Sequence, residues 1–532
     1  MLILSKSTTA KLTASILAIA TAQAAAADSI TLSTVDGRTS VIGELIDYDG
    51  TSYKLSTVLG ELVLKASEAI CDGDACPALI SETTNLSVAG SGTVTASLIP
   101  ALTQAYFGTI SDKLQREDDT GGTTYFEIDR KAGNDLLMTL VHSNSTKGFQ
   151  DLVKGDLHAA FTTRPASLVE QEAAEFAGLD PLRSEAQESV IAYDGLMMVT
   201  HPDNPVRAMT EMDIAKVYSG EIDNWEAFDR EPGKINVYVR EDESNSRDLL
   251  REVLLDPNRK TLAQNLIVLE SDSDIASAVR ADPNAIGLTS FVHRAGVNAL
   301  EIEGVCGIRI PANEFTIKTG EYLFSRPVYF YHNEQIAHGG VTGFADFMTS
   351  HKASEVVREA GFVDREIISK PLNDQGLRVS HTIMRDEAYE NISGTKNMLQ
   401  LMSRSERLST TIRFDNGSTD LDTTDYKDIE ALAELIRSPE HANSQFYFMG
   451  FSDSIGRADL NQFLALQRAE IVRQALISRH PDLVDRIEAR SIGYGELSPL
   501  ACNETRPGRN VNRRVEVWVQ DPMTKLASND IN

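Results

Sequence analysis

The alternation of apolar and polar residues near the N-terminus is typical of short β-strands. Residues 45–48 and 53–56 carry this pattern, and they flank Asp49-Gly50, a dipeptide that favours a hairpin turn. Residues 28–80 therefore predict a small β module, a meander of four or five short strands. Its sequence shows no catalytic or ligand-binding motif, so we expect the module to act as a spacer or as a surface that binds a partner.

Residues 459–479 predict an amphipathic helix, because apolar positions recur there at helical spacing. These positions are Leu460, Leu464, Ile471, Ala475 and Leu476. Asn461 and Arg468 are seven residues apart and share one stripe of this helix. Asp453 precedes the helix in a Gly- and Ser-rich turn, so its carboxylate and the Arg468 guanidinium can face one pocket. That pair suits a zwitterion, although a plain surface ion pair between the two residues fits the same spacing.

Four motifs surround this helix. They are Gly450-Phe451-Ser452-Asp453, Gln467-Arg468-Ala469-Glu470, Gly493-Tyr494-Gly495-Glu496 and the run from Gly508 to Val517. Together they resemble the OmpA-like peptidoglycan-binding domain, which implies a βαβαββ fold over 406–522. The resemblance implies binding to the meso-diaminopimelate of the peptidoglycan stem peptide through four residues. They are Asp453, Asn461, Arg468 and Arg513. Ser452 and Phe451 depart from the Thr and His that are frequent in the family.

A strand that leads into a Gly-rich turn opens the largest region. Residues 86–93 read Leu-Ser-Val-Ala-Gly-Ser-Gly-Thr, and an apolar-periodic helix follows through Leu98, Leu102 and Phe107. Backbone N–H groups at such a helix start bind anions, and the helix dipole assists. Taken alone, Gly-Ser-Gly-Thr fits an ordinary loop as well.

Further segments follow the order of one family. They are 142–149, 161–165, 192–205, 218–225, 237–247, 285–289 and 317–331. With them, residues 84–365 resemble a type II periplasmic binding protein of the phosphate-binding kind. The resemblance implies two α/β lobes, a ligand cleft at the strand ends and closure by a hinge motion. The whole chain is thus expected to be a multidomain protein of α/β and α+β class.

The same resemblance implies a set of anion donors in the cleft. They are Ser91, Thr93, Ser145, Thr163, Arg164, Arg240, Ser244 and Ser246. Hydroxyls and guanidinium groups of this kind replace the water around a small oxyanion such as phosphate. In the second lobe, Asn245 stands where the family has Gly, and Asn tolerates a left-handed backbone. Asp242 and Glu243 place negative charge beside the expected anion and oppose phosphate specificity.

Residues 366–405 predict a connector between these two regions. Pro371, Asp374 and Gly376 interrupt it early, and a polar helical segment follows. We expect a semi-rigid arm.

Residues 1–27 predict a secretory signal peptide. Lys6 and Lys11 flank a short apolar run, and an Ala-rich stretch ends at Ala27. The run is too short to favour a membrane-spanning helix, and no Cys follows it in a lipoprotein context. We therefore expect a periplasmic protein that is associated with peptidoglycan or the outer membrane.

The net charge of the chain limits which classes of partner it can bind. The net charge is −28, which repels nucleic acid and anionic membrane surfaces at long range. We therefore expect no nucleic-acid partner. A small anion can still bind, because a pocket works through local donors.

Four cysteines are present. Cys71 and Cys76 close a short turn-forming loop, and in an exported protein we expect them to form a disulfide. No His neighbours them, so a metal site there is the minor alternative. Cys306 and Cys502 lie in different predicted domains, and the sequence allows either a second disulfide or two buried thiols.

The function that fits best is a cell-wall-attached solute-binding protein that takes a small oxyanion, with an ABC transporter permease as a further partner. An envelope tether with an empty binding-protein fold is the alternative. We expect no enzyme, cofactor or metal, because His-Glu-x-x-His and Gly-x-Ser-x-Gly are absent and the ten His form no ligand cluster. An envelope hydrolase would need a base near Ser91, where His142 is the one nearby candidate.

Overall fold

The computed structural model describes most of the chain in two compact units. The described residues are 29–34, 40–48, 52–58, 60–65, 69–73, 75–76, 84–92, 94–110, 114–118, 123–128, 136–241, 245–332, 340–484, 486 and 488–521. The first unit takes residues 1–83 and 129–135, and the second takes 84–128 and 136–532. The predicted signal peptide and the Asp49-Gly50 turn lie outside the described residues.

The first unit is a five-stranded sheet with the order β4-β3-β2-β1-β5. Its strands are β1 (Ser29–Thr34), β2 (Ser40–Tyr48), β3 (Ser52–Thr57), β4 (Gly60–Lys65) and β5 (Ala69–Asp72). Strands β2 and β3 pair antiparallel, as the hairpin pattern predicts. Ile30, Leu32, Tyr53 and Leu55 form its core, and a disulfide joins Cys71 to Cys76.

The second unit begins with a sheet of eleven strands that serves two lobes. Lobe 1 (84–190 and 328–362) contains β6 (Thr84–Ser91), β7 (Leu114–Asp118), β8 (Thr123–Ile128), β9 (Leu136–Ser143) and β10 (Ala159–Thr162). Lobe 2 (196–324) contains β13 (Asn236–Arg240), β14 (Ile267–Leu269), β15 (Ala285–Ser290) and β16 (Asn298–Ala299). Beside this sheet, lobe 2 carries a small one of β12 (Ala208–Thr210), β17 (Glu301–Glu303) and β18 (Arg309–Ile310).

Two long strands cross between the lobes. Strand β11 (Glu188–Thr200) pairs with β19 (Ser325–His332) through its first half and with β15 of lobe 2 through its second half. Strand β19 also pairs with β10 of lobe 1. The two-lobed α/β fold expected from the sequence is confirmed, with β11 and β19 as the hinge strands.

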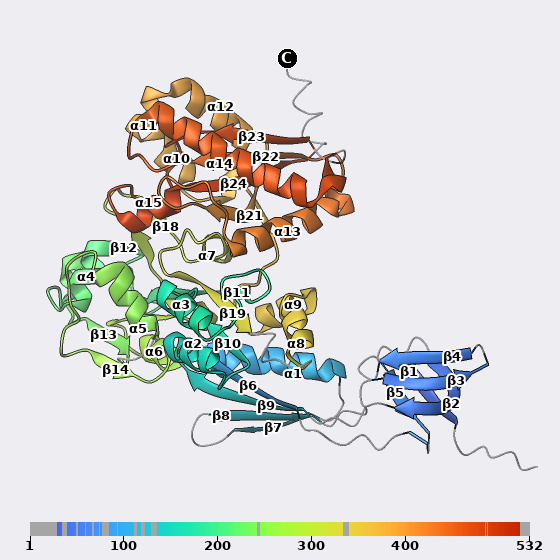
Figure 1. Ribbon diagram of the computed structural model, residues 1–532. Helices are drawn as coiled ribbons and strands as arrows, with labels where there is room; N and C mark the ends of the chain where they lie inside the picture. The colour runs from blue at the N-terminus through green and yellow to red at the C-terminus, as the bar shows by residue number, and fades with distance from the viewer. Residues whose placement is uncertain are drawn as a thin grey trace, which may run out of the picture. The chain divides into compact units, whose positions relative to one another are not determined.

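Helices cover the lobes as their apolar faces require. In lobe 1 they are α1 (Ile99–Ile110), preceded by the π-helical turn Val94–Leu98, α2 (Ser145–Lys154), α3 (Leu168–Phe176), α8 (Gly340–Met348) and α9 (His351–Glu359). In lobe 2 they are α4 (Glu211–Tyr218), α5 (Asn245–Leu250), α6 (Asp272–Ala281) and α7 (Glu314–Lys318). Figure 1 shows α8 and α9 beside α1. The predicted apolar positions Leu98, Leu102 and Phe107 are all buried. Across the described residues, every helix is too short or too polar to span a bilayer.

The C-terminal domain has the βαβαββ order predicted from its motifs, with one short helix before the last strand. Its elements are β21 (Glu406–Arg413), α13 (Thr423–Arg437), β22 (Gln445–Phe451), α14 (Ala458–Arg479), β23 (Glu488–Gly493), α15 (Arg506–Asn512) and β24 (Arg514–Gln520). In the sheet the order is β20-β21-β24-β22-β23. Helices α13 and α14 pack on it over a core that includes Ile429, Phe448 and Val472 (Figure 1).

The prediction of a separate arm at 366–405 is wrong. Strand β20 (Ser369–Pro371) pairs with β21, so the C-terminal sheet begins inside this segment. Helices α10 (Arg378–Ile383), α11 (Asp386–Glu390) and α12 (Ile392–Met402) follow. Met398 and Met402 are buried against Trp518 and Met449 of the sheet. Because these apolar side chains pack on the sheet, the segment belongs to the C-terminal domain.

The helix predicted at 459–479 is α14, and its buried face agrees with the prediction at Leu476 but differs from it nearer the start of the helix. Leu460 is 57% exposed, whereas Asn461 and Arg468 are buried with Ala465, Ala469 and Val472. Two polar residues thus occupy the inward face, which is why apolar spacing alone misplaced it. A side chain at Gly450 would overlap the Ala465 carbonyl, so Gly450 lets α14 lie directly on β22.

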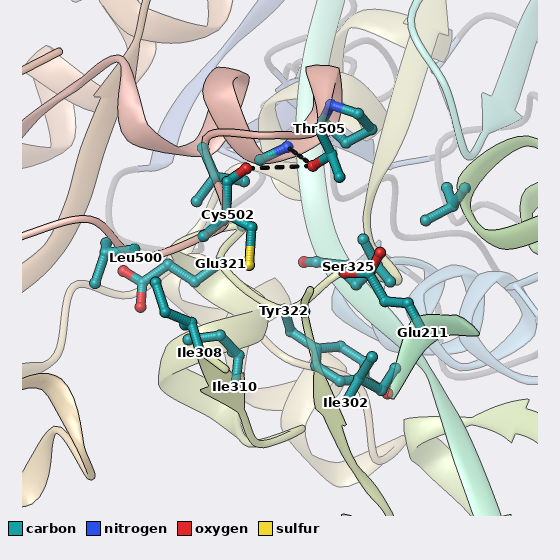
Figure 2. A pocket seen from close by; sticks show the side chains of 18 of the residues that line it. Glu211, Ile302, Ile308, Ile310, Glu321, Tyr322, Ser325, Leu500, Cys502 and Thr505 are labelled. Atoms are coloured by element: carbon teal, nitrogen blue, oxygen red, sulfur yellow. Dashed lines mark hydrogen bonds between the residues drawn. The ribbon is translucent and has the colours of Figure 1, made fainter. Parts of the chain in front are cut away.

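A second disulfide, Cys306–Cys502, joins lobe 2 to the C-terminal domain, which settles the alternative left open by the sequence. Beside it lies a cavity of about 170 Å³ with mostly apolar walls. Figure 2 shows its lining, with Leu500 and Cys502 from the C-terminal domain and Ile302, Ile308 and Ile310 from lobe 2. The C-terminal domain also contacts lobe 1, where Lys427 Nζ donates to Ser189 Oγ at 2.7 Å.

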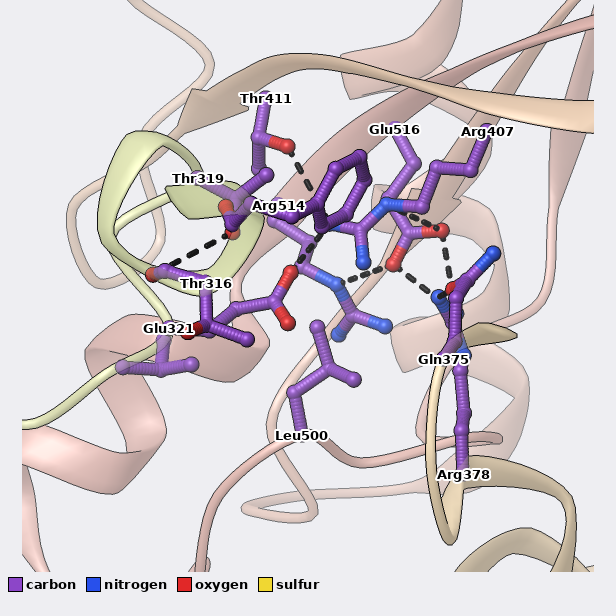
Figure 3. Close-up of polar contacts among 12 residues, drawn as sticks. Thr316, Thr319, Glu321, Gln375, Arg378, Arg407, Thr411, Leu500, Arg514 and Glu516 are labelled. Carbon is purple, nitrogen blue, oxygen red and sulfur yellow. Dashed lines mark hydrogen bonds and ion pairs between the residues drawn. The ribbon is translucent and has the colours of Figure 1, made fainter. Parts of the chain in front are cut away.

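A buried charge network supports the C-terminal sheet. Figure 3 shows the Glu516 carboxylate among three guanidinium groups. Glu516 lies 2.9 Å from Arg378, 2.7 Å from Arg514 and 3.4 Å from Arg407. Arg407 in turn pairs with Glu321, which follows α7 in lobe 2. The network therefore ties α10, the sheet and the hinge region of the binding-protein fold together.

Candidate functional site

A cavity of about 620 Å³ lies between the two lobes. Lobe 1 lines it with Gly92, Ala96, Ser97, His142, Ser143, Asn144 and Lys147. Lobe 2 lines it with Arg240, Glu241, Ser246, Glu270, Ser271, Asp272, Ser273 and His293, and the hinge strand β19 adds Arg326. The ends of strands and the starts of helices thus meet at one cleft, as in open α/β folds that bind ligands.

The lobe 1 wall is built around the start of α2. Asn144 caps this helix, because its side chain accepts a hydrogen bond from the Lys147 N–H at 2.8 Å. Asn144 and Lys147 both line the cavity, so the first turn of α2 borders it. Helix N-termini present N–H groups and the positive end of the dipole, which favours an anion.

The lobe 2 wall holds Arg240 next to carboxylates. Arg240 Nη1 lies 3.3 Å from Asp272 Oδ1, and its Nη2 lies 3.6 Å from Glu241 Oε1. Asp272 is buried at the start of α6. Arg240 Nε is buried without a hydrogen-bond partner among the described residues. The guanidinium is thus partly paired and keeps one donor for a ligand.

Arg326 is a cleft residue that the sequence reasoning missed as a site residue. It is fixed on the hinge by Asp194 of β11, with Nη2 and Nε at 2.7 Å and 3.1 Å from Asp194 Oδ2. Ser290 Oγ donates to the other oxygen of Asp194 at 2.7 Å. Arg326 lay in a segment assigned only to the final strand, and no local motif marked it as a donor. Its position comes from strand pairing.

Two histidines line the cleft from opposite lobes. Burial lowers the pKa of His142 in lobe 1, and burial likewise lowers the pKa of His293 in lobe 2. Both imidazoles are therefore neutral near pH 7, where each has one donor and one acceptor nitrogen.

Only some of the anion donors expected from the sequence line the cavity. Arg240 and Ser246 line the cavity. Ser145 Oγ accepts from the Thr163 N–H at 3.1 Å, and neither residue belongs to the cavity lining. The Arg164 guanidinium is held by both oxygens of Glu170 at 2.7 Å and 2.8 Å and is not among the described lining residues, so its role as a donor stays a prediction. Thr93, Ser244 and the Ser91 side chain lie outside the described residues.

The predicted C-terminal residues lie on neighbouring elements. Arg513, directly before β24, pairs with Asp453 after β22, with Nη1 at 2.6 Å from Oδ2. Arg513 Nε also donates to the Phe414 carbonyl at 3.0 Å. Asp453 Oδ1 accepts the Ile455 N–H at 3.0 Å, so the carboxylate is fixed from both sides. The expected ion-pair alternative of Asp453 with Arg468 is wrong, since Arg513 takes that place and all three residues are buried.

Arg468 is held by backbone rather than by a carboxylate. Its Nε donates to the Ser418 carbonyl and its Nη2 to the Asp415 carbonyl, both at 3.0 Å. The guanidinium lies over the Phe414 ring at 5.1 Å. Its Nη1 is buried with no partner in the described part of the chain. Burial and the neighbouring Arg513 lower the pKa of Arg468 to about 10, while Asp453 opposes this, so the group is still charged at pH 7.

Asn461 is the fourth residue predicted for the C-terminal domain. Its Nδ2 donates to Glu496 Oε2 at 3.3 Å. Burial raises the pKa of Glu496, and the carboxylates of Glu387 and Glu390 raise it further. The last two residues belong to α11, so the segment predicted as a semi-rigid connector contributes negative charge beside Asn461.

Two lobes joined by two crossing strands, with a polar cleft between them, define the periplasmic binding-protein class. Residues 82–352 match the family model described as the PBP superfamily domain, and residues 413–513 match the OmpA family. The first match covers half of the chain, so the chain belongs to the PBP superfamily, and its C-terminal part is an OmpA-family domain.

Individual proteins match each part. Phosphate-binding protein PstS of Borreliella burgdorferi is 29% identical over 194 residues, which are 35% of this chain and 68% of that protein. Outer membrane porin F of Pseudomonas aeruginosa is 31% identical over 130 residues, which are 24% of this chain and 36% of the porin. An ABC-type phosphate transport receptor from Vibrio cholerae has a TM-score of 0.40 at 22% identity, covering 52% of this chain and 99% of the receptor.

Proposed function

We propose that this chain is a periplasmic binding protein that holds a small oxyanion, with phosphate as the first candidate, and attaches to peptidoglycan through its C-terminal domain. One observation carries the first half. A single cavity brings together the start of α2, the hydroxyl of Ser246 and the guanidinium groups of Arg240 and Arg326.

This donor set suits an oxyanion. Helix N–H groups and hydroxyls replace the water around the ligand, and guanidinium groups supply charge-assisted hydrogen bonds. The cleft lies between lobes that two strands connect, so a hinge motion can close it over a ligand. The 29% identity to phosphate-binding protein PstS supports this assignment.

The C-terminal half of the proposal rests on Arg468 and Asp453. The unpartnered Nη1 of Arg468 is a buried donor that a ligand carboxylate can satisfy, and Asp453 can accept from an ammonium group. Meso-diaminopimelate offers both groups on one side chain. The 32% identity to peptidoglycan-binding protein ArfA of Mycobacterium tuberculosis over 108 residues supports this half.

The anion site is tested by calorimetry and thermal shift on protein stripped of ligand in mild denaturant and refolded. Phosphate, sulfate and a phosphonate are titrated in turn, and a bound anion should stabilise the protein by about 2.7 kcal/mol at one hundred times its dissociation constant. Arg240→Gln should weaken binding, and Arg251→Gln, on the exposed surface of lobe 2, is the matched control. Absence of heat and of thermal shift with every anion would leave the domain as an envelope tether, the alternative function.

The wall site is tested by sedimentation with isolated sacculi. Arg468→Lys keeps the charge and removes the forked donor, so most co-sedimentation should be lost while the circular dichroism spectrum is kept. Arg473→Lys on the same helix, where Arg473 pairs with Glu470, is the control. Wild-type sedimentation of the double variant Asp453→Ala/Arg468→Ala would place the wall contact elsewhere. Transfer of the ligand to an ABC transporter permease stays a prediction from the resemblance.

A further inference from the structure

In its described lining, the cleft lacks the unpaired basic side chains that a site for a purely anionic ligand would have. Every basic residue that lines it already has a carboxylate partner. Lys147 pairs with Asp151, Arg240 pairs with Asp272 and Glu241, and Arg326 pairs with Asp194.

One carboxylate is left over. Glu270 lines the cavity and is exposed, and in the described part of the chain no cation pairs with it. Among the described lining residues, three basic side chains thus stand against three carboxylates, and the two lining histidines are neutral. The described lining therefore has no net positive charge, and the whole chain carries a net charge of −28. A ligand that brings only negative charge leaves the cleft with uncompensated negative charge, because like charges in one site repel.

The carboxylates are confined to one wall. Lobe 1 lines the cleft with the start of α2, the hydroxyls of Ser97 and Ser143, and Lys147, and its described lining residues include no carboxylate. Lobe 2 contributes Glu241, Glu270 and Asp272 beside Arg240. Both walls therefore offer donors, whereas the carboxylate acceptors lie on the lobe 2 wall.

We propose that the ligand of this cleft is a zwitterion, an organic phosphonate or phosphate ester that carries a primary ammonium group. Its oxyanion binds at the start of α2 and at Arg240 and Arg326. Its ammonium group binds the lobe 2 wall, where Glu270 is the free carboxylate. This inference rests on the proposed oxyanion function and narrows it to one class of ligand.

The size of the cleft leaves room for a ligand that is larger than inorganic phosphate. A water molecule occupies about 30 Å³ in the liquid, so a cavity of about 620 Å³ holds roughly twenty waters. A tetrahedral oxyanion replaces only a few of them. An organic arm that ends in an ammonium group fills more of this volume and reaches the second wall.

The test compares ligands that differ only in the ammonium group. Stripped and refolded full-length protein is titrated by calorimetry with 2-aminoethylphosphonate, ethylphosphonate and inorganic phosphate. An ammonium–carboxylate contact across the cleft should make 2-aminoethylphosphonate bind at least about tenfold tighter than ethylphosphonate. It should also bind tighter than inorganic phosphate.

A substitution at Glu270 then tests whether this residue causes the preference for the amino ligand. Glu270→Gln should reduce the preference for the amino ligand to near unity while ethylphosphonate binds as well as before or better. Glu172→Gln, on the exposed surface of α3, is the matched control and should keep the wild-type preference. Glu241→Gln is a second variant, and it should reduce the preference in part.

The possible outcomes distinguish failure of the zwitterion inference from failure of the proposed oxyanion binding. Equal binding of 2-aminoethylphosphonate and ethylphosphonate, or tighter binding of phosphate, overturns the zwitterion and leaves oxyanion binding in place. An unchanged preference in both Glu270→Gln and Glu241→Gln moves the ammonium contact away from lobe 2 and also overturns the inference. Binding of none of the three ligands overturns the proposed function together with the inference.

Discussion

The cleft and the C-terminal domain hold their guanidinium groups in different ways. In the C-terminal domain, Arg468 is fixed by the backbone carbonyls of Asp415 and Ser418. In the cleft, Arg240 and Arg326 are held by the carboxylates of Asp272 and Asp194. Backbone partners leave the positive charge of Arg468 largely uncompensated, whereas carboxylate partners compensate Arg240 and Arg326. The first arrangement suits a ligand carboxylate, and the second suits an oxyanion that also carries a positive group.

The frameworks behind the two sites also differ. Apolar cores support the lobes, with Leu254, Ile275 and Val279 in lobe 2 and Leu98, Phe107 and Phe344 in lobe 1. The C-terminal sheet has, besides its apolar core, a buried network in which Glu516 compensates three arginines. Breaking one buried ion pair leaves an uncompensated charge, which costs more than losing a few apolar contacts at a surface. Loss of the Glu516 charge should therefore destabilise the C-terminal domain in particular.

Glu516→Gln should give the largest effect. It removes the carboxylate that Arg378, Arg407 and Arg514 share, and we expect a loss of about 3–5 kcal/mol in the free energy of unfolding of the C-terminal domain. Calorimetry should show an early separate unfolding transition, and sacculus sedimentation should fall. Anion binding in the cleft should persist, because the apolar cores of the two lobes hold the cleft residues in place.

Glu440→Gln changes an exposed carboxylate of the same domain and serves as the control. A single unshifted unfolding transition in Glu516→Gln would show that the network contributes little. Loss of anion binding together with wall binding would contradict the independence of the two frameworks.

Sequence motifs predicted the folds of both regions, whereas the binding role of four C-terminal residues stays a prediction. Asp453, Asn461, Arg468 and Arg513 come from motifs that flank one helix and two adjacent strands. Their positions follow from short-range geometry. Apolar spacing misplaced part of the inner face of α14, because the polar residues Asn461 and Arg468 occupy buried positions there.

The cleft was harder to predict because its residues are brought together by long-range pairing. Arg326 and Asp194 lie 132 residues apart and meet through the pairing of β11 and β19. The partner of Arg164 was also invisible, since any of many acidic residues fits the sequence, and only the fold selects Glu170. The packing of 366–405 was missed for the same reason, because its apolar residues are few and their target is the distant Trp518.

Removal of the disulfide between lobe 2 and the C-terminal domain should give the second-largest loss of stability. The separation between Cys306 and Cys502 is 196 residues, against 5 for Cys71 and Cys76. A cross-link that closes a longer loop restricts the unfolded chain more, so Cys306→Ser/Cys502→Ser should lower the free energy of unfolding by about 2–4 kcal/mol. Cys71→Ser/Cys76→Ser should cost the second unit nothing.

Thermal unfolding of the two double variants and of the wild type checks this, after mass spectrometry of unreduced peptides has shown both pairs in the wild type. Two free thiols at 306 and 502 in protein made in the periplasm would contradict the link between the regions. Equal unfolding curves for the two double variants would contradict its contribution to stability.

The smallest effect concerns pH at a cavity of about 290 Å³ where the C-terminal domain meets the hinge. Asp425 lines it together with Asp422, Asp428 and three basic residues. The basic residues are Lys318, Arg365 and Arg413. Burial, and then the Asp422 carboxylate, raise the pKa of Asp425 to about 8 from its ordinary value of 3.8. Burial raises the pKa of Asp428 to about 6.

Because the folded pKa of Asp425 lies above its unfolded value, the folded state binds more protons between them, and stability falls as pH rises from about 4 to about 8. Asp428 is half ionised at pH 6 and almost fully ionised at pH 8, so in the window between pH 7 and pH 8 the slope belongs mainly to Asp425. The wild-type melting temperature should therefore fall by a few degrees across this window, and Asp425→Asn, which cannot ionise, should flatten the curve. Asp420→Asn, at an exposed position before α13, should keep the wild-type slope. A melting temperature that rises with pH, or a slope that Asp425→Asn leaves unchanged, would show that Asp425 is ionised at the interface and that the basic residues of the cavity compensate it.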